Sequence, residues 1–91
     1  MRLISTEGRC PPTDFRTALE QGLAPDGGLY VPENLGRVDS EVLGQLPGRS
    51  FPEVSRIVAE HLLGADFSSS DLDQLVHSAF DFEVPLVEVE D

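Results

Sequence analysis

The segment GLAPDGGLYVP, from Gly22 to Pro32, constrains the fold of this chain more than any other stretch. Gly22 follows an apolar helical pattern and is predicted to end that helix with a left-handed backbone, with Leu23 folding back onto the last turn. Proline and glycine at the second and fourth positions of Ala24–Gly27 predict a β-turn. The β-prone run Leu29–Val31 follows and ends at a proline. The segment therefore predicts a helix end, a tight turn and a short strand in direct succession.

The paired glycines of this segment allow a second interpretation. Consecutive glycine amides can form an anion-binding nest, but such loops usually open a helix, whereas a β-prone run follows here. Asp26 lies directly before Gly27 and Gly28, and its charge would repel a phosphate. For Tyr30, core packing of the ring is favoured over lining a neighbouring pocket. We expect a structural corner, and we retain Asp26, Gly27, Gly28 and Tyr30 as candidate residues that line an interface or a pocket.

Apolar spacing and capping residues predict the other elements of the first part of the chain. Met1–Ser5 is predicted to form a short strand. Thr13 is predicted to cap a helix of about two turns, with Asp14 favourably placed in its first turn. The apolar residues that share one face of this helix are Phe15, Ala18 and Leu19.

Three further helices are predicted in the second part of the chain. Ser40 is a candidate cap for a short helix. Ser50 and Glu53 have the spacing of a capping box, and the apolar stripe that follows ends before Gly64. Ser70 is predicted to cap the last helix. The stripes of the two longer helices contain Phe51, Val54, Ile57, Val58 and Leu62, and then Leu72, Leu75, Val76, Ala79 and Phe80.

The end of the chain alternates apolar and acidic residues. Phe82, Val84 and Leu86 follow one phase, and Val87 and Val89 follow the other. This pattern predicts an extended strand, for which few partner strands remain among these residues. Together the elements predict an α+β fold, a small domain of three to four helices packed beside a few short β-strands.

The charge balance limits the partners of the chain. Its 91 residues include 17 acids and six bases, which give a formal net charge of −11, and nine acids follow the last base, Arg56. Such a surface repels nucleic acid and anionic membranes. No stretch approaches the roughly 20 apolar residues of a membrane span. The single cysteine favours a reducing compartment, so we expect a cytoplasmic protein with no nucleic-acid or membrane partner.

The residue types present also exclude several chemistries. All six bases are arginines, so neither a Schiff base nor a Walker-type phosphate loop can be completed with a lysine of this chain. Cys10 has no histidine nearby in sequence and is interpreted as an incidental small residue. His61 and His77 have no second ligand at helical spacing, which favours a surface or helix-end role over metal binding. We therefore expect no catalytic, cofactor-binding or metal-binding residue within this chain.

Two motifs, taken together, resemble the N-terminal domain of threonine synthase. They are Ile4-Ser5-Thr6-x-Gly8 and the segment from Gly22 to Pro32. The similarity continues through Val54, Ile57 and Val58 into Ala79-Phe80 and Pro85-Leu86-Val87. It implies an N-terminal domain over residues 1–80 and an extended segment, 81–91, that leads into a catalytic domain. One position departs from the family, which commonly has a base where Glu7 stands here, and Arg9 follows two positions later.

The resemblance implies a lyase that uses pyridoxal phosphate to convert O-phospho-L-homoserine and water into L-threonine and phosphate. In such enzymes the cofactor acts as the electron sink, and the protein supplies a lysine and a phosphate cradle. The resemblance places that lysine further on, in the catalytic domain. Residues 1–91 would then be structural, would bind no cofactor and would be inactive alone, with the catalytic domain as their partner. Two alternatives stay open: a threonine-synthase-like phospho-lyase, and a free-standing acidic module that binds a basic protein surface.

Overall fold

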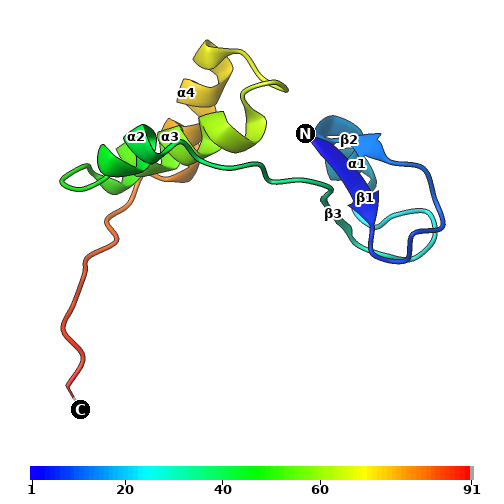
Figure 1. Ribbon diagram of the computed structural model, residues 1–91, viewed down its shortest axis with the longest axis horizontal. Helices are drawn as coiled ribbons and strands as arrows, with labels where there is room; N and C mark the ends of the chain where they lie inside the picture. The colour runs from blue at the N-terminus through cyan, green and yellow to red at the C-terminus, as the bar shows by residue number, and fades with distance from the viewer. Residues whose placement is uncertain (91) are drawn as a thin grey trace. The chain divides into compact units, whose positions relative to one another are not determined.

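The computed structural model describes residues 1–90 as two compact units, Met1–Arg37 and a second that begins at Val38. The described residues contain four helices and one three-stranded sheet, which confirms the predicted α+β class (Figure 1). The elements in chain order are β1 (Arg2–Ser5), β2 (Thr13–Asp14), α1 (Phe15–Gln21), β3 (Tyr30–Pro32), α2 (Ser40–Gly44), α3 (Phe51–Leu63) and α4 (Ser69–Ala79).

The first unit is an antiparallel sheet with one short helix. The strand order is β2-β1-β3, so β1 lies in the middle. On one side Leu3 pairs with Thr13, and on the other side Ser5 pairs with Tyr30. The buried residues of this unit are Leu3, Ser5, Ala18, Ala24 and Gly28. So small a core makes the unit dependent on its hydrogen bonds.

The start of α1 corrects one sequence prediction. Thr13 is not the N-cap, because it pairs with β1 in the two-residue strand β2, which the sequence did not reveal. The cap is Asp14, whose backbone is extended and whose carboxylate accepts the Thr17 N–H at 2.8 Å. Pairing of Thr13 with β1 moves the first free capping side chain one residue further along.

The end of α1 agrees with the prediction in one respect and corrects it in another. Gly22 has φ +76° and its N–H donates to the Ala18 carbonyl, which confirms a positive φ at this glycine. Leu23 is 61% exposed, so the predicted packing of this side chain on the last turn is wrong. The physical reason is the ψ of −95° at Gly22, which turns the chain away from the helix instead of continuing into the left-handed helical region.

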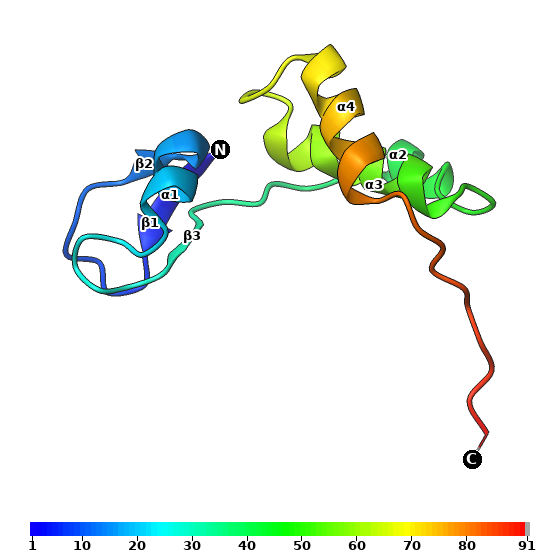
Figure 2. The ribbon, with the colours of Figure 1, turned by 180° about the vertical axis from the view of Figure 1, so that it is seen from behind.

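The second unit is built on α3 and α4, which pack against each other (Figure 2). Leu72 and Val76 of α4 are its buried apolar residues. Beside them Arg56 of α3 donates to Asp73 and Ser69 of the other helix. Apolar burial therefore holds the helix pair, and a guanidinium fixes how the two helices align.

The three helix starts of this unit show how far capping signals can be read from sequence. The capping box of α3 is present, with Ser50 and Glu53 bonding to each other's backbone, as predicted. The other two predicted caps are wrong. Asp39, not Ser40, caps α2, and Ser68, not Ser70, caps α4 by accepting the Asp71 N–H at 3.1 Å. In both cases an equally good capping residue stands slightly earlier, so the helix begins sooner.

The predicted strand at the end of the chain does not belong to a sheet in the described residues. Positions 81–90 lie outside every helix and strand and are all exposed. The ribbon runs away from α4 as an extended trace (Figure 2).

Candidate functional site

The glycine corner, residues Ala24–Gly28, is closed by two backbone hydrogen bonds. The Gly27 N–H donates to the Ala24 carbonyl at 2.9 Å, which confirms the predicted β-turn. The Ala24 N–H donates to the Gly28 carbonyl, also at 2.9 Å. Gly27 has φ +87°, a value that other residues adopt only with strain. The chain thus reverses within these five residues before it enters β3.

The carboxylate of Asp26 is the hub of the corner. It accepts the Ser5 hydroxyl at 2.6 Å, the Gly28 N–H at 3.0 Å and the Arg9 N–H at 2.9 Å. These donors come from the end of β1, from the corner itself and from the loop after β1. One side chain therefore connects the motif Ile4–Gly8 with the segment Gly22–Pro32.

The hydrogen bonds to Asp26 also fix its charge. The Ser5 hydroxyl and then the Gly28 N–H hold the pKa of Asp26 at about 2, below its ordinary value of 3.8. Ser5, only 5% exposed, has its hydroxyl satisfied by this bond. The corner is consequently built around a permanent negative charge at neutral pH.

Gly28 is required by close packing. A Cβ atom at this position would lie 2.3 Å from Ser5 Oγ and 2.9 Å from Thr6 Oγ1. Neither hydroxyl can easily give way, because Ser5 donates to Asp26 and Thr6 Oγ1 accepts the Leu29 N–H at 2.9 Å. The sequence suggested a permissive backbone at this glycine, whereas the structure shows a steric requirement.

The same contacts decide between the two interpretations of the paired glycines. The Gly27 N–H is already bonded to Ala24, and the Gly28 N–H is bonded to Asp26. A nest needs free amides that converge on the anion, and here an anionic side chain already occupies that position. The corner therefore has a structural role, and its glycine amides do not fit a phosphate group.

Tyr30 combines the two roles that the sequence left open. Its ring is half-buried, and its hydroxyl donates to Gln21 Oε1 at 3.1 Å. The ring also lines an open hollow of about 520 Å³ between α1 and β3, together with Phe15, Leu19 and Leu29. Burial, then the nearby Cys10 and Asp26, raise the pKa of the hydroxyl. The phenol stays neutral at any physiological pH.

The other candidate residues are Cys10 in the first unit and His61 and His77 in the second. Cys10 is half-buried, and its thiol lies near the Tyr30 hydroxyl. His61 and His77 are exposed in the last turns of α3 and α4, the helix-end positions that the sequence predicted. Within residues 1–90, no three acidic, histidine or cysteine side chains gather as a metal site would require.

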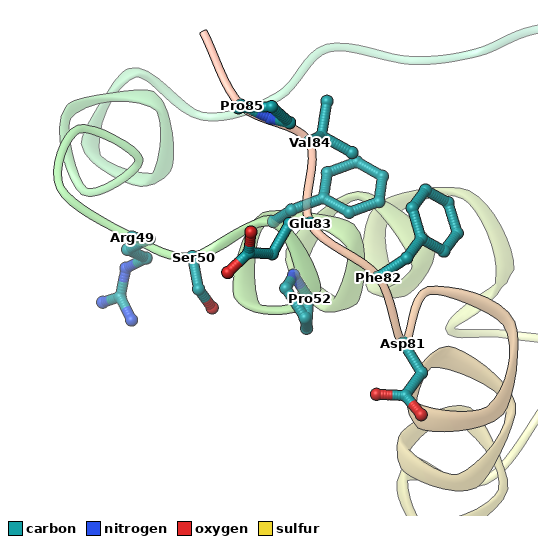
Figure 3. A pocket seen from close by; sticks show the side chains of 9 residues that line it. Arg49, Ser50, Pro52, Asp81, Phe82, Glu83, Val84 and Pro85 are labelled. Carbon is teal, nitrogen blue, oxygen red and sulfur yellow. The ribbon is translucent and has the colours of Figure 1, made fainter.

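A second hollow, of about 590 Å³, lies where the chain leaves α4 (Figure 3). Residues 49–52 at the start of α3 form one wall, and residues 81–85 form the other. The Phe51 ring packs edge-on against Phe80, with 5.6 Å between ring centroids, and at a tilt of 48° against Phe82, with 5.5 Å between centroids. The sequence placed Phe51 and Phe80 on separate helical stripes and gave no sign of this aromatic cluster.

Comparison with known proteins identifies the family. A family described as "Threonine synthase N terminus" matches residues 2–80. This chain belongs to that family. The match contains both units as far as the end of α4, and it includes the whole glycine corner. The resemblance noted in the sequence is confirmed.

Individual relatives agree with the family match. The chain is 35% identical over 80 residues to threonine synthase of Pseudomonas aeruginosa, and 38% identical over 81 residues to threonine synthase-like 2 of Mus musculus. Each alignment covers 88% of this chain but only 17% of the relative. No solved structure matches. Among the described residues, no helix is long and apolar enough to cross a membrane.

Proposed function

We propose that this chain is the N-terminal part of a threonine synthase that converts O-phospho-L-homoserine and water into L-threonine and phosphate. The observation that carries the proposal is the family match over residues 2–80, together with the similarity to the Pseudomonas aeruginosa enzyme. In this proposal the chain contributes structure and an interface, and the reacting groups come from the rest of the enzyme. Its partner is that catalytic part, and its place of action is the cytoplasm.

The chain's own residues argue for a supporting role. Pyridoxal phosphate chemistry needs a lysine for the imine and a cradle for the phosphate. The sequence has no lysine, and the amides of its glycine pair are both engaged. The residues present therefore do not fit this cofactor. We propose that Asp26, Gly27, Gly28 and Tyr30 shape a rigid corner against which the catalytic part packs.

The proposal can be tested with a chimera. In it, residues 1–91 of this chain replace the aligned N-terminal segment of Pseudomonas aeruginosa threonine synthase. We expect the chimera with pyridoxal phosphate to release phosphate from O-phospho-L-homoserine, and the isolated chain to release none. The matched control is the same bacterial enzyme without its N-terminal segment. A stable imine absorbance band from the isolated chain and the cofactor would contradict the supporting role.

A second candidate within the family is a threonine-synthase-like phospho-lyase. The observation that favours it is the 38% identity to threonine synthase-like 2 of Mus musculus, slightly above the 35% to the bacterial synthase. A parallel chimera with the mouse protein discriminates the two. Restored activity in the mouse chimera alone would favour the phospho-lyase, and restored activity in the bacterial chimera alone would favour the synthase.

A further inference from the structure

The tail, residues 81–90, contains five large apolar side chains, and all five are exposed. Leu86 is fully exposed, Val89 is 87% exposed, and Val87 is 69% exposed. Apolar side chains that gather on an exposed segment in this way often mark a surface that another part of a protein covers. The contacts of the tail indicate which of its residues pack on this chain and which remain available to a partner.

The tail changes its apolar face at Pro85. In an extended chain, alternate residues point to opposite sides. Up to Leu86 the apolar side chains are on the even-numbered side, at Phe82 and Val84, and the odd-numbered side is acidic at Asp81 and Glu83. Beyond Leu86 the arrangement reverses, with Val87 and Val89 on the odd-numbered side and Glu88 and Glu90 on the even-numbered side. A strand buried on one face throughout would not show this reversal.

The structure gives the two halves different contacts. Phe82 packs on Phe51 at 5.5 Å, so the first half is attached to the start of α3. The hollow of about 590 Å³ beside that contact is lined as far as Pro85 and no further along the tail (Figure 3). Pro85 has no N–H and cannot donate to a neighbouring strand. The proline therefore marks the end of the segment that packs on this chain.

The second half needs a partner that the sheet of this chain is poorly suited to provide. The outer edge of β3 spans three residues, Tyr30–Pro32, and includes a proline that cannot donate a hydrogen bond. At the other edge β2 has only two residues. Such short edges would pair with little of the run from Leu86 to Glu90. The acids of the tail, with no base after Arg56, would in addition favour a partner of opposite charge.

We propose that residues 86–90 form a β-strand that adds to the edge of a sheet in the catalytic part, an edge flanked by arginine or lysine side chains. The proposal rests on the proposed function. Val87 and Val89 face the apolar side of that sheet, and Glu88 and Glu90 face the basic side chains. The functional boundary between this chain's own packing and its partner then lies at Pro85, later than residue 80, where the family match ends.

The first test uses the isolated chain and decides where the boundary lies. Phe82→Ala removes the ring that packs on Phe51, so we expect it to lower the melting temperature of the helices by about 4 °C or more. Val87→Ala and Val89→Ala are matched controls on the same tail and should leave the melting temperature unchanged. Equal losses from all three variants would overturn the boundary at Pro85, and so would no loss from Phe82→Ala.

The second test uses the chimera and decides whether the strand forms. We expect hydrogen exchange at residues 86–90 to be at least about 100-fold slower in the chimera than in the isolated chain. Val87→Thr together with Val89→Thr, which keeps strand propensity, should reduce that protection, and added salt should weaken it further. Unprotected amides in an active chimera would overturn the strand and leave the proposed function standing. Protected amides in an inactive chimera would support the strand and contradict the proposed function.

Discussion

The two units of this chain keep their shape by different means. In the first unit a single carboxylate, that of Asp26, accepts three hydrogen bonds, and a glycine fits where no Cβ could. In the second unit two helices bury Leu72 and Val76 between them. Hydrogen-bonded corners depend on the positions of individual atoms, whereas helix pairs depend on apolar area removed from water. The same small substitution should therefore have very different effects in the two units.

The chain contains its own reporter for each unit. Tyr30 is the only tyrosine and there is no tryptophan, so tyrosine fluorescence follows the first unit. Most helical residues belong to α3 and α4, so circular dichroism at helical wavelengths follows mainly the second unit. Each variant below can thus be assigned to the unit that it disturbs.

The largest effect is expected from Leu72→Ala in the second unit. Leu72 is 1% exposed and is the largest fully buried side chain described. Its truncation should lower the free energy of unfolding by about 2–5 kcal/mol, measured by urea unfolding with circular dichroism. The matched control is Leu75→Ala on the same helix, which is 49% exposed and should cost less than about 1 kcal/mol. Similar costs for both variants would show that α4 does not bury the face seen here.

Gly28→Ala should produce the next largest effect, and it should appear in the first unit. The added methyl group would meet Ser5 Oγ and Thr6 Oγ1, both held by hydrogen bonds. We expect a loss of about 1–3 kcal/mol in the tyrosine-detected unfolding. Gly44→Ala is the control, because that glycine lies in α2 with no atom within 4 Å of the new Cβ. It should be neutral or stabilising by up to about 1 kcal/mol in the unfolding followed by circular dichroism, which reports on the second unit. Tolerance of alanine at both positions would contradict the steric role of Gly28.

This contrast between units also explains how much the sequence could predict. Local patterns predicted the longer helices, the turn at Ala24–Gly27 and the positive φ at Gly22, because these depend on residues close together in the chain. The strand β2 could not be predicted, since two residues form a strand only when β1 lies beside them. The role of Asp26 was hidden for the same reason, because its partner Ser5 is 21 positions away.

The caps show a different limit of sequence reasoning. Ser68 and Ser70 are chemically identical, and a helix can begin after either of them. The choice depends on where α4 must begin to place Leu72 and Val76 against α3. The aromatic cluster of Phe51, Phe80 and Phe82 was missed because it forms only when the chain turns back after α4. Contacts of this kind are properties of the folded chain and leave no local signal.

The cap assignment gives a prediction of moderate size. Ser68→Ala removes the hydroxyl that accepts the Asp71 N–H, so it should lower the free energy of unfolding by about 1 kcal/mol. Ser70→Ala is the matched control inside the first turn, and it should change the stability by less than about 0.5 kcal/mol, because alanine favours the helix. Circular dichroism in urea measures both. A larger loss of stability from Ser70→Ala than from Ser68→Ala would indicate that Ser70 caps α4, as the sequence suggested.

The smallest effect at neutral pH is expected from Asp26→Asn, because its amide oxygen can still accept the Ser5 hydroxyl and the Gly28 N–H, and only the exposed Arg9 N–H loses its acceptor. Its signature is the pH dependence. The pKa of Asp26 is about 2 in the folded chain, held down by the Ser5 hydroxyl and the Gly28 N–H, against 3.8 ordinarily. The unfolded chain therefore takes up the proton first as the pH falls. The stabilisation from ionised Asp26 is complete above about pH 4 and is lost progressively between pH 4 and pH 2.

Tyrosine-detected melting of the wild-type chain should fall across this range, and Asp26→Asn should make the fall smaller. Asp14 also has a lowered pKa, caused by its hydrogen bonds with Thr17, and it lies in the same unit. Asp14→Asn is therefore the matched control, because it removes a second carboxylate of the same unit that titrates in the acid range and caps a helix. Because Asp26 connects three segments and Asp14 holds only one helix end, the pH dependence should flatten more in Asp26→Asn. A pH profile of Asp26→Asn identical to that of the wild type would mean that the corner does not depend on this charge.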